Sequence, residues 1–158
     1  GIGYDFYDKY KSDFSNEFVK EVSLEELQNK SDVLSFHIPQ NEETIGMFNE
    51  RFIDKMEQDF YLINLSRGKI VESAALVKGL KSGHILGAGL DVLEFEKDSF
   101  ENFFADQNKF PEAFKYLVAS PKVILSPHVG GWTKESYRKL SDVLLSKIRT
   151  AKKEGLIT

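Results

Sequence analysis

Short apolar runs alternate with amphipathic segments along most of this chain. The runs are rich in β-branched, leucine and aromatic residues, which is typical of buried strands. The segments between them have apolar residues three or four positions apart, which is typical of helices. Strands that alternate with helices predict an α/β fold with a parallel sheet. The predicted strands cover residues 2–7, 33–38, 60–65, 85–92 and 123–125.

Polar residues mark the ends of the predicted helices. Ser23 is placed as an N-cap, and Glu26 three positions later completes a capping box. Asn49 can cap a second helix. A third helix covers residues 73–82 and is followed by Gly83, which suits the left-handed C′ position. These signals predict where the crossovers between strands begin and end.

The alternation breaks at residues 95–120, where phenylalanine is concentrated. Pro111 can occupy the first position of a short helix, since that position needs no N–H donor. We interpret the segment as an inserted lid or packing segment, because so many aromatic residues disfavour a solvated linker. Its phenylalanines are Phe95, Phe100, Phe103, Phe104, Phe110 and Phe114.

A long amphipathic helix is predicted after Thr133, which can serve as its N-cap. Residues 151–158 are polar and are expected to form a C-terminal tail beyond a domain that covers residues 1–150. The apolar residues of the helix recur with helical period. They are Tyr137, Leu140, Val143, Leu144 and Ile148.

Composition narrows the classes of partner. The 21 Lys+Arg oppose 25 Asp+Glu, and this net charge of -4 without a basic stripe argues against nucleic acid. There is no cysteine, which excludes disulfides and thiolate metal sites and fits a reducing cytoplasm. No apolar run approaches the roughly 20 residues of a membrane helix, and the opening residues show no signal-peptide pattern. Of the three histidines, His84 lies in a polar turn and is expected to be exposed.

Three segments with candidate chemistry each follow a predicted strand. Open α/β sheets bind ligands beyond the carboxyl ends of their strands, so residues there are the first candidates. In residues 64–68, Arg67 has the planar fork that suits a bidentate substrate carboxylate. A surface salt bridge is the ordinary role of an isolated arginine, and this segment alone favours that role.

The other two segments supply carboxylates and a histidine. Asp91, Glu94 and Glu96 follow one strand, although a solvated acidic loop is the ordinary interpretation of such a run. His128 lies between a strand and a helix N-terminus, and Gly130 lets the backbone approach a ligand there. A lone histidine is more often structural, but this placement is the one that cofactor sites use. A histidine beside a glutamate could protonate a ketone oxygen and, in reverse, accept a proton from an alcohol.

Five segments carry a resemblance, which in one-letter code are YDKY, SDVLSFHIP with NEET, NLSRGKIVE, GAGLDVLEFE and SPHVGG. In this order and spacing they resemble the D-isomer-specific 2-hydroxyacid dehydrogenases, which include D-lactate and D-3-phosphoglycerate dehydrogenases. The resemblance runs over nearly the whole chain. It implies a Rossmann-like doubly wound parallel sheet, NAD as cofactor, and hydride transfer between NAD(H) and a 2-hydroxy or 2-keto acid.

This resemblance assigns the catalytic roles. Arg67 would bind the substrate carboxylate and polarise the carbonyl, and His128 would be the acid/base. Glu96 would be the carboxylate paired with the histidine, and register chooses it over Glu94. No metal ligand is implied.

Cofactor neighbours follow from the same resemblance. An acidic residue at the end of the family's second strand binds the ribose hydroxyls and implies NAD over NADP. Asp5 and Asp8 compete for this position, and Asp8 is preferred because the turn after it suits the end of that strand. Asp91 resembles the acidic residue near the nicotinamide carboxamide. The remaining predicted neighbours are His37, Pro39, Ser66 and Gly130.

The sequence also departs from the family. The Gly-rich phosphate loop with its first βα unit is absent, and so is the substrate domain. Because the first strand is central in a Rossmann sheet, the strands within residues 1–38 lack a neighbour on one side. We therefore expect a fragment of a chain roughly twice as long, whose residues 1–150 are the later part of an NAD-binding domain. The resemblance further implies a homodimer.

A second function on the same fold stays open. An NAD-sensing or corepressor-type protein would bind the cofactor with little turnover. The full set of Arg67, Glu96 and His128 favours the dehydrogenase. A hydrolase is disfavoured because the sequence has no GxSxG elbow, and a zinc site because it has no clustered ligands.

Overall fold

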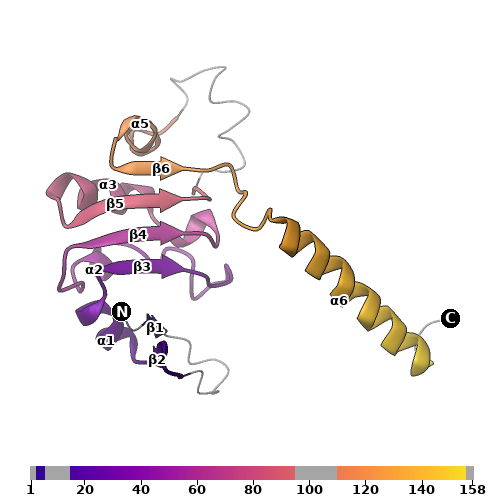
Figure 1. Cartoon of the computed structure of the whole chain (residues 1–158). Coiled ribbons are helices and arrows are strands. Elements are labelled where there is room, and N and C mark those ends of the chain that lie inside the picture. The colour runs from indigo at the N-terminus through magenta and orange to yellow at the C-terminus, as the bar shows by residue number, and fades with distance from the viewer. Residues whose placement is uncertain (1–2, 6–14, 95–109, 156–158) are drawn as a thin grey trace. The chain divides into compact units, whose positions relative to one another are not determined.

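The computed structural model describes residues 3–5, 15–94 and 110–155. The chain divides after Pro127 into two compact units, Gly1–Pro127 and His128–Thr158. In its described part, the first unit holds the strands and the shorter helices. The second holds the long helix α6 (Lys134–Lys153), drawn in yellow in Figure 1.

A four-stranded parallel sheet forms the centre of the first unit (Figure 1). All three pairings are parallel, so the carboxyl ends of the strands lie along one edge. The predicted α/β fold class is confirmed, and each strand lies within its predicted range. In spatial order the strands are β3 (Val33–Phe36), β4 (Phe60–Asn64), β5 (Ile85–Leu90) and β6 (Val123–Leu125).

Two further strands form a separate parallel pair, β1 (Gly3–Asp5) and β2 (Val19–Glu21). The sequence analysis missed β2, because its three residues include one apolar side chain and show no alternation. The described part of the chain gives β3 a partner on one side only, which is β4. This arrangement agrees with the missing neighbour that the sequence predicts for the early strands.

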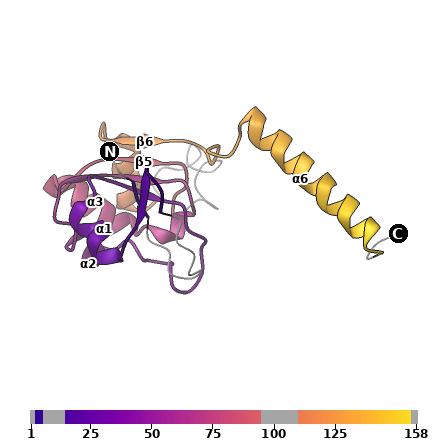
Figure 2. The ribbon, with the colours of Figure 1, turned by 60° about the horizontal axis from the view of Figure 1, so that its bottom comes forward.

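The helices of the first unit lie on one face of the sheet, as Figure 2 shows for α1, α2 and α3. Between helices and sheet lies one apolar core, in which Phe48, Phe60 and Phe114 are fully buried. On the opposite face Val33 and Ile124 are exposed. These helices are α1 (Leu24–Lys30), α2 (Glu50–Ile53), α3 (Ser73–Ser82) and α5 (Glu112–Ala119). A short 3-10 helix, η2 (Gly68–Ile70), lies between β4 and α3.

The predicted N-caps are confirmed, but the capping box at α1 is only half formed, because the Glu26 carboxylate pairs with Lys20 and Lys30 and not with the Ser23 N–H. The Ser23 hydroxyl accepts the N–H of Glu26, and Thr133 and Asn49 accept the third N–H of their helices in the same way. Gly83 has a φ of 87°, the left-handed conformation expected of a C′ glycine. The predicted place of Pro111 was wrong by one residue: it is the N-cap of α5 and not its first residue.

The aromatic segment contributes to packing where it is described. Phe110 and Phe114 are buried, and their rings stack with centroids 5.0 Å apart. The other four phenylalanines of the segment fall within residues 95–109, outside the described residues. The prediction of a packing segment is therefore confirmed at its carboxyl end.

Candidate functional site

The turn after β4 presents Arg67. Strand β4 ends at Asn64, whose side chain is fully buried. Its Oδ1 accepts the backbone N–H of Ser66 at 3.1 Å and the Ser66 hydroxyl at 2.7 Å. Its Nδ2 donates to the carbonyl oxygen of Arg67 at 3.1 Å. One asparagine side chain thus closes the turn, in the manner of an Asx-turn.

The Arg67 side chain is exposed, and Nη1 donates to the carbonyl oxygen of Ser66 at 2.7 Å. Among the described residues no carboxylate forms an ion pair with it. The described part of the chain therefore offers no carboxylate for the surface salt bridge that is the ordinary role of such an arginine. The remaining N–H donors of the guanidinium can receive an anion.

The turn lies directly against the segment after β5. A Cβ atom on Gly68 would lie 1.8 Å from the carbonyl oxygen of Leu93, far inside any van der Waals contact. Only glycine allows the two backbones to approach this closely. The sequence places Gly68 and Leu93 in different segments, and the structure brings those segments together.

Asp91 joins the same cluster from β5. It is 3% exposed, and its backbone N–H donates to the carbonyl oxygen of Asn64 at 3.0 Å. Its Oδ1 accepts the hydroxyl of Ser126 at 2.6 Å, and the Ser126 N–H donates to the carbonyl oxygen of Leu90 at 3.0 Å. The ends of β4, β5 and β6 are therefore tied together, at the edge where parallel sheets bind ligands.

Glu94 has a structural role in this region. Its Oε2 accepts the N–H of Ser73 at 2.9 Å, where it satisfies a free donor at the start of α3. This use agrees with the preference for Glu96 as the catalytic carboxylate. Glu96 itself lies outside the described residues.

His37 and Pro39 follow β3 at the same edge of the sheet. His37 is exposed, and its Nε2 lies 2.7 Å from the Ser35 hydroxyl. The carbonyl oxygen of Pro39 accepts the hydroxyl of Thr44 at 2.7 Å, which closes the loop behind it. Their place on the adenosine side of a cofactor stays a prediction.

The ribose position stays a prediction. Asp5 ends β1, in register with Glu21 of β2. Asp8 lies outside the described residues. Both aspartates therefore stay open as candidates.

His128 and Gly130 belong to the second unit. His128 has a φ of 54°, in the left-handed region that few non-glycine residues adopt. Of the predicted site residues, the structure gathers Ser66, Arg67 and Asp91 into one cluster. The catalytic pair of His128 and Glu96 stays a prediction.

Ion pairs with displaced pKa values lie on the helices. A hydrogen bond from Lys30, with a second from Lys20, lowers the pKa of Glu26 on α1. A hydrogen bond to Glu50 raises the pKa of Lys78 on α3. These side chains are exposed, so the pairs contribute little to stability.

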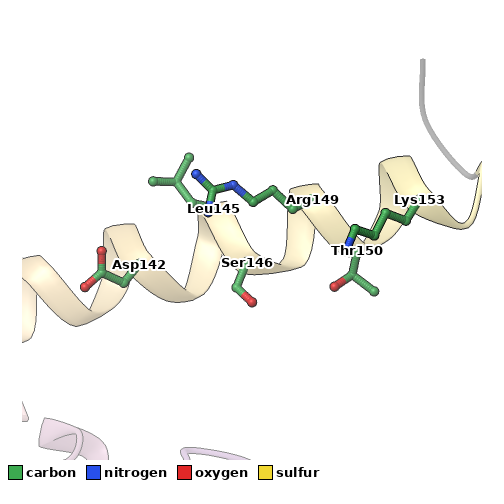
Figure 3. Close-up of a pocket in the computed structure, with 6 residues that line it drawn as sticks. All are labelled: Asp142, Leu145, Ser146, Arg149, Thr150 and Lys153. Carbon is green, nitrogen blue, oxygen red and sulfur yellow. The ribbon is translucent and has the colours of Figure 1, made fainter.

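Other kinds of site find no support in the described part of the chain. No group of three or more His, Cys, Asp or Glu side chains there could hold a metal ion. No helix there is long and apolar enough to cross a membrane. A hollow on α6 is lined by residues of that helix alone, between Asp142 and Lys153 (Figure 3). One helix surface cannot enclose a ligand, so the hollow is not a candidate site.

Two residues of the cluster were missed by the sequence analysis. The signal for Asn64 is an asparagine at the end of a buried apolar run with a serine two positions later, which is the pattern of an Asx-turn. Ser126 has no comparable local signal, because its partner Asp91 lies 35 residues away, just after β5. His84 was expected to be exposed and is instead half-buried, with both ring nitrogens in hydrogen bonds.

Comparison with known proteins identifies the family of the chain. A family model described as "D-isomer specific 2-hydroxyacid dehydrogenase, NAD binding domain" matches residues 1–130. An aromatic 2-oxoacid reductase of Clostridium sporogenes (strain ATCC 15579) is 30% identical over 154 residues, which cover 98% of this chain and 46% of that protein. A D-lactate dehydrogenase of Lactobacillus delbrueckii subsp. bulgaricus is 36% identical over 119 residues, which cover 75% of this chain and 35% of that protein.

Solved structures give the same result. The NAD-complexed form of a D-isomer specific 2-hydroxyacid dehydrogenase from Lactobacillus delbrueckii ssp. bulgaricus superposes with a TM-score of 0.80 at 29% identity. The match covers 97% of this chain and 46% of that one. The chain therefore spans about half the length of these relatives or less.

Proposed function

This chain belongs to the D-isomer specific 2-hydroxyacid dehydrogenase family, and from this premise we propose that its protein transfers a hydride between NAD(H) and a 2-hydroxy or 2-keto acid. One observation carries the proposal. Arg67 lies at the carboxyl edge of the parallel sheet, in a turn closed by a buried asparagine, with no carboxylate partner among the described residues. A small anionic substrate supplies the missing partner.

Arg67 binds the substrate in this proposal. Its planar guanidinium holds the carboxylate of the 2-keto acid through two parallel N–H donors. The same positive charge polarises the neighbouring carbonyl as negative charge develops on its oxygen. Arginine at this position thus serves both orientation and electrostatic stabilisation.

The residues at this edge suit an NAD ligand. The buried Asp91 carboxylate lies at this edge beside Ser126, and a carboxylate can accept the N–H donors of a nicotinamide carboxamide. NADH, when bound, supplies the hydride. We place the other cofactor contacts at His37, Pro39, Ser66 and Gly130, with Asp8 or Asp5 at the ribose.

His128 is the proposed acid/base, with Glu96 as its partner. In the reducing direction the imidazolium gives its proton to the carbonyl oxygen while the carbonyl carbon receives the hydride. In the oxidising direction the neutral ring takes the proton of the hydroxyl group. A paired carboxylate favours the charged ring and so favours reduction.

The wider organisation is also proposed. Residues 1–150 form the later part of the NAD-binding domain, and residues 151–158 form a polar tail that begins in the last turn of α6. The match covers 46% of these relatives' length, and we propose that the Gly-rich phosphate loop and the substrate domain belong to the length outside the match. We expect a cytoplasmic homodimer that acts on small molecules, with no nucleic-acid, membrane or metal partner.

The test uses the full-length protein with the sequence that flanks these residues in its gene. NADH consumption is followed against a panel of 2-keto acids, with NADPH in parallel. Turnover with at least one keto acid and a preference for NADH supports the proposal. Tight NADH binding without turnover on any acid would replace it with the NAD-sensing or corepressor function.

A further inference from the structure

Asn64 is an unusual residue for its position, because its amide side chain is fully buried at the end of an otherwise apolar strand. Burying an amide is costly unless its polar atoms find partners. Oδ1 has two donors, both from Ser66, and Nδ2 has the carbonyl oxygen of Arg67. The side chain is thus paired at both ends, and every partner belongs to the turn that carries Arg67.

The backbone of Asn64 links this turn to the next strand. Its carbonyl oxygen accepts the N–H of Asp91, the proposed nicotinamide contact. The side chain and the main chain of one residue therefore hold the substrate-binding and cofactor-binding elements together. Gly68 completes the arrangement by contacting the backbone of Leu93.

We propose that Asn64 is a positioning residue for Arg67, an inference that rests on the proposed function above. Its Nδ2–H bond fixes the Arg67 carbonyl and with it the direction in which the side chain leaves the backbone. Because the turn is already ordered, binding the substrate carboxylate costs less conformational entropy than it would with a mobile turn. Asn64 does not touch the substrate, so its effect on the reaction passes through Arg67.

The amide group is specifically required. Aspartate has nearly the same shape and keeps the acceptor for the two Ser66 donors, but it lacks the N–H donor. In Asn64→Asp a carboxylate oxygen would face the carbonyl oxygen of Arg67, and two acceptors at that distance repel each other. The variant therefore removes the bond to Arg67 and keeps the acceptor for Ser66, but it also places a carboxylate in a fully buried position.

The chain offers a matched control at Asn49. Its Oδ1 caps α2 and its Nδ2 donates to the carbonyl oxygen of Gly46 at 2.8 Å. Asn49→Asp removes the same kind of amide-to-carbonyl bond and keeps the cap, because aspartate is an equally good N-cap. Because Asn49 is half-buried and Asn64 fully buried, this control matches the lost hydrogen bond and not the burial of a charge, which the uncharged Asn64→Ser variant separates.

The experiment measures steady-state kinetics and NADH affinity in the full-length protein for Asn64→Asp and Asn49→Asp. For Asn64→Asp we expect KM for the keto acid to rise about tenfold, with a smaller fall in kcat and an NADH Kd within about twofold. For Asn49→Asp all three constants should stay within about twofold. Equal effects of the two substitutions would overturn the proposal.

A double-mutant cycle separates positioning from a merely structural role. If Asn64 acts through Arg67, adding Asn64→Asp to an Arg67→Ala background lowers kcat/KM no further. An additive loss shows that Asn64 acts by another route and overturns the inference. If Arg67→Ala alone leaves kcat/KM unchanged, the proposed role of Arg67 has failed instead.

Folding is checked by circular dichroism and thermal unfolding. Should Asn64→Asp fail to fold, the smaller Asn64→Ser, which also lacks the amide donor and carries no charge, replaces it in both experiments with the same expectations. A variant of Asn64 that lowers only the melting temperature, with unchanged kcat and KM below it, contradicts the positioning role.

Discussion

Each end of the sheet has a basic side chain, His84 at the amino ends of the strands and Arg67 at the carboxyl ends, and the two differ in their partners. At the amino ends, His84 precedes β5, and its ring nitrogens lie 2.9 Å from Oδ1 of Asp59 and 3.1 Å from the Met56 carbonyl oxygen. At the carboxyl ends, the Arg67 guanidinium bonds to the carbonyl of Ser66 and has no carboxylate partner among the described residues. The histidine with its carboxylate looks more like an acid/base pair, yet both its nitrogens are already engaged. Pairing, more than residue type, distinguishes the amino ends of the strands from the proposed site at their carboxyl ends.

Substitution of His128 is expected to have the largest effect. His128→Gln removes the proposed acid/base, and turnover with keto acids should fall by about 10²–10⁴-fold, the usual contribution of general acid–base catalysis. NADH binding should change little, because glutamine keeps a hydrogen-bonding side chain. Steady-state kinetics and NADH titration of the full-length protein measure both. A loss of NADH affinity that matches the loss of turnover would contradict the acid/base role.

Arg67→Lys should come next. Lysine keeps the charge and loses the bidentate fork, so KM for the keto acid should rise by about ten- to a hundredfold, which corresponds to one or two charged hydrogen bonds. Because Arg67 is exposed, the melting temperature should stay nearly constant. Kinetics over a range of keto acid concentrations give KM and kcat separately. Unchanged kinetics would remove Arg67 from the substrate site.

Gly68→Ala tests the close contact that holds the functional end together. The added methyl group would overlap the backbone of Leu93, and the free energy of unfolding should fall by about 1–3 kcal/mol, as overpacking usually costs. Gly89→Ala is the control, since an added Cβ there meets nothing within 4 Å. Urea unfolding of both variants gives the difference. Equal stabilities would show that the turn can move away from Leu93 at little cost.

The smallest effect is expected at the amino ends. His84→Gln loses the ion pair with Asp59 and should destabilise the fold by about 1 kcal/mol or less, because that aspartate is largely exposed. Turnover should be the same as in the unmodified protein. Thermal unfolding and kinetics measured side by side check both statements. A marked loss of turnover in His84→Gln would show that the amino ends of the strands also affect the reaction, which contradicts the comparison.

Sequence patterns predicted much of the fold and part of the site. The strands β3 to β6 and the caps at Ser23, Asn49 and Thr133 were predicted because each depends on residues close in sequence. The strand ends were less accurate: β3 stops at Phe36 although the apolar run continues to Ile38. Pairing with β4 ends at Phe36, and an apolar pattern does not record where a neighbour stops.

The residues of the candidate site likewise fall into those that could be predicted from the sequence and those that could not. Arg67 was a candidate because a charged residue after a buried strand is visible in the sequence. Asn64 was missed because the sequence does not show that the folded turn brings the Arg67 carbonyl oxygen to 3.1 Å from the Asn64 Nδ2. Ser126 was missed because its partner Asp91 follows a different strand, β5, and is far away in sequence. The position of Arg67 after a strand could be read from the sequence, whereas the contacts of Asn64 and Ser126 could be read only from the fold.

The sequence by itself determined the order of strands and helices, the helix caps and the segments that carry chemistry. These depend on periodicity and on contacts over three or four residues, where propensity and capping dominate. The tertiary structure alone decided which segments meet: the turn of Arg67 with the backbone of Leu93, the carbonyl of Asn64 with Asp91, and Asp91 with Ser126. Parallel strands acquire such neighbours through crossovers, so contacts between residues far apart in sequence follow from the packing of the whole sheet.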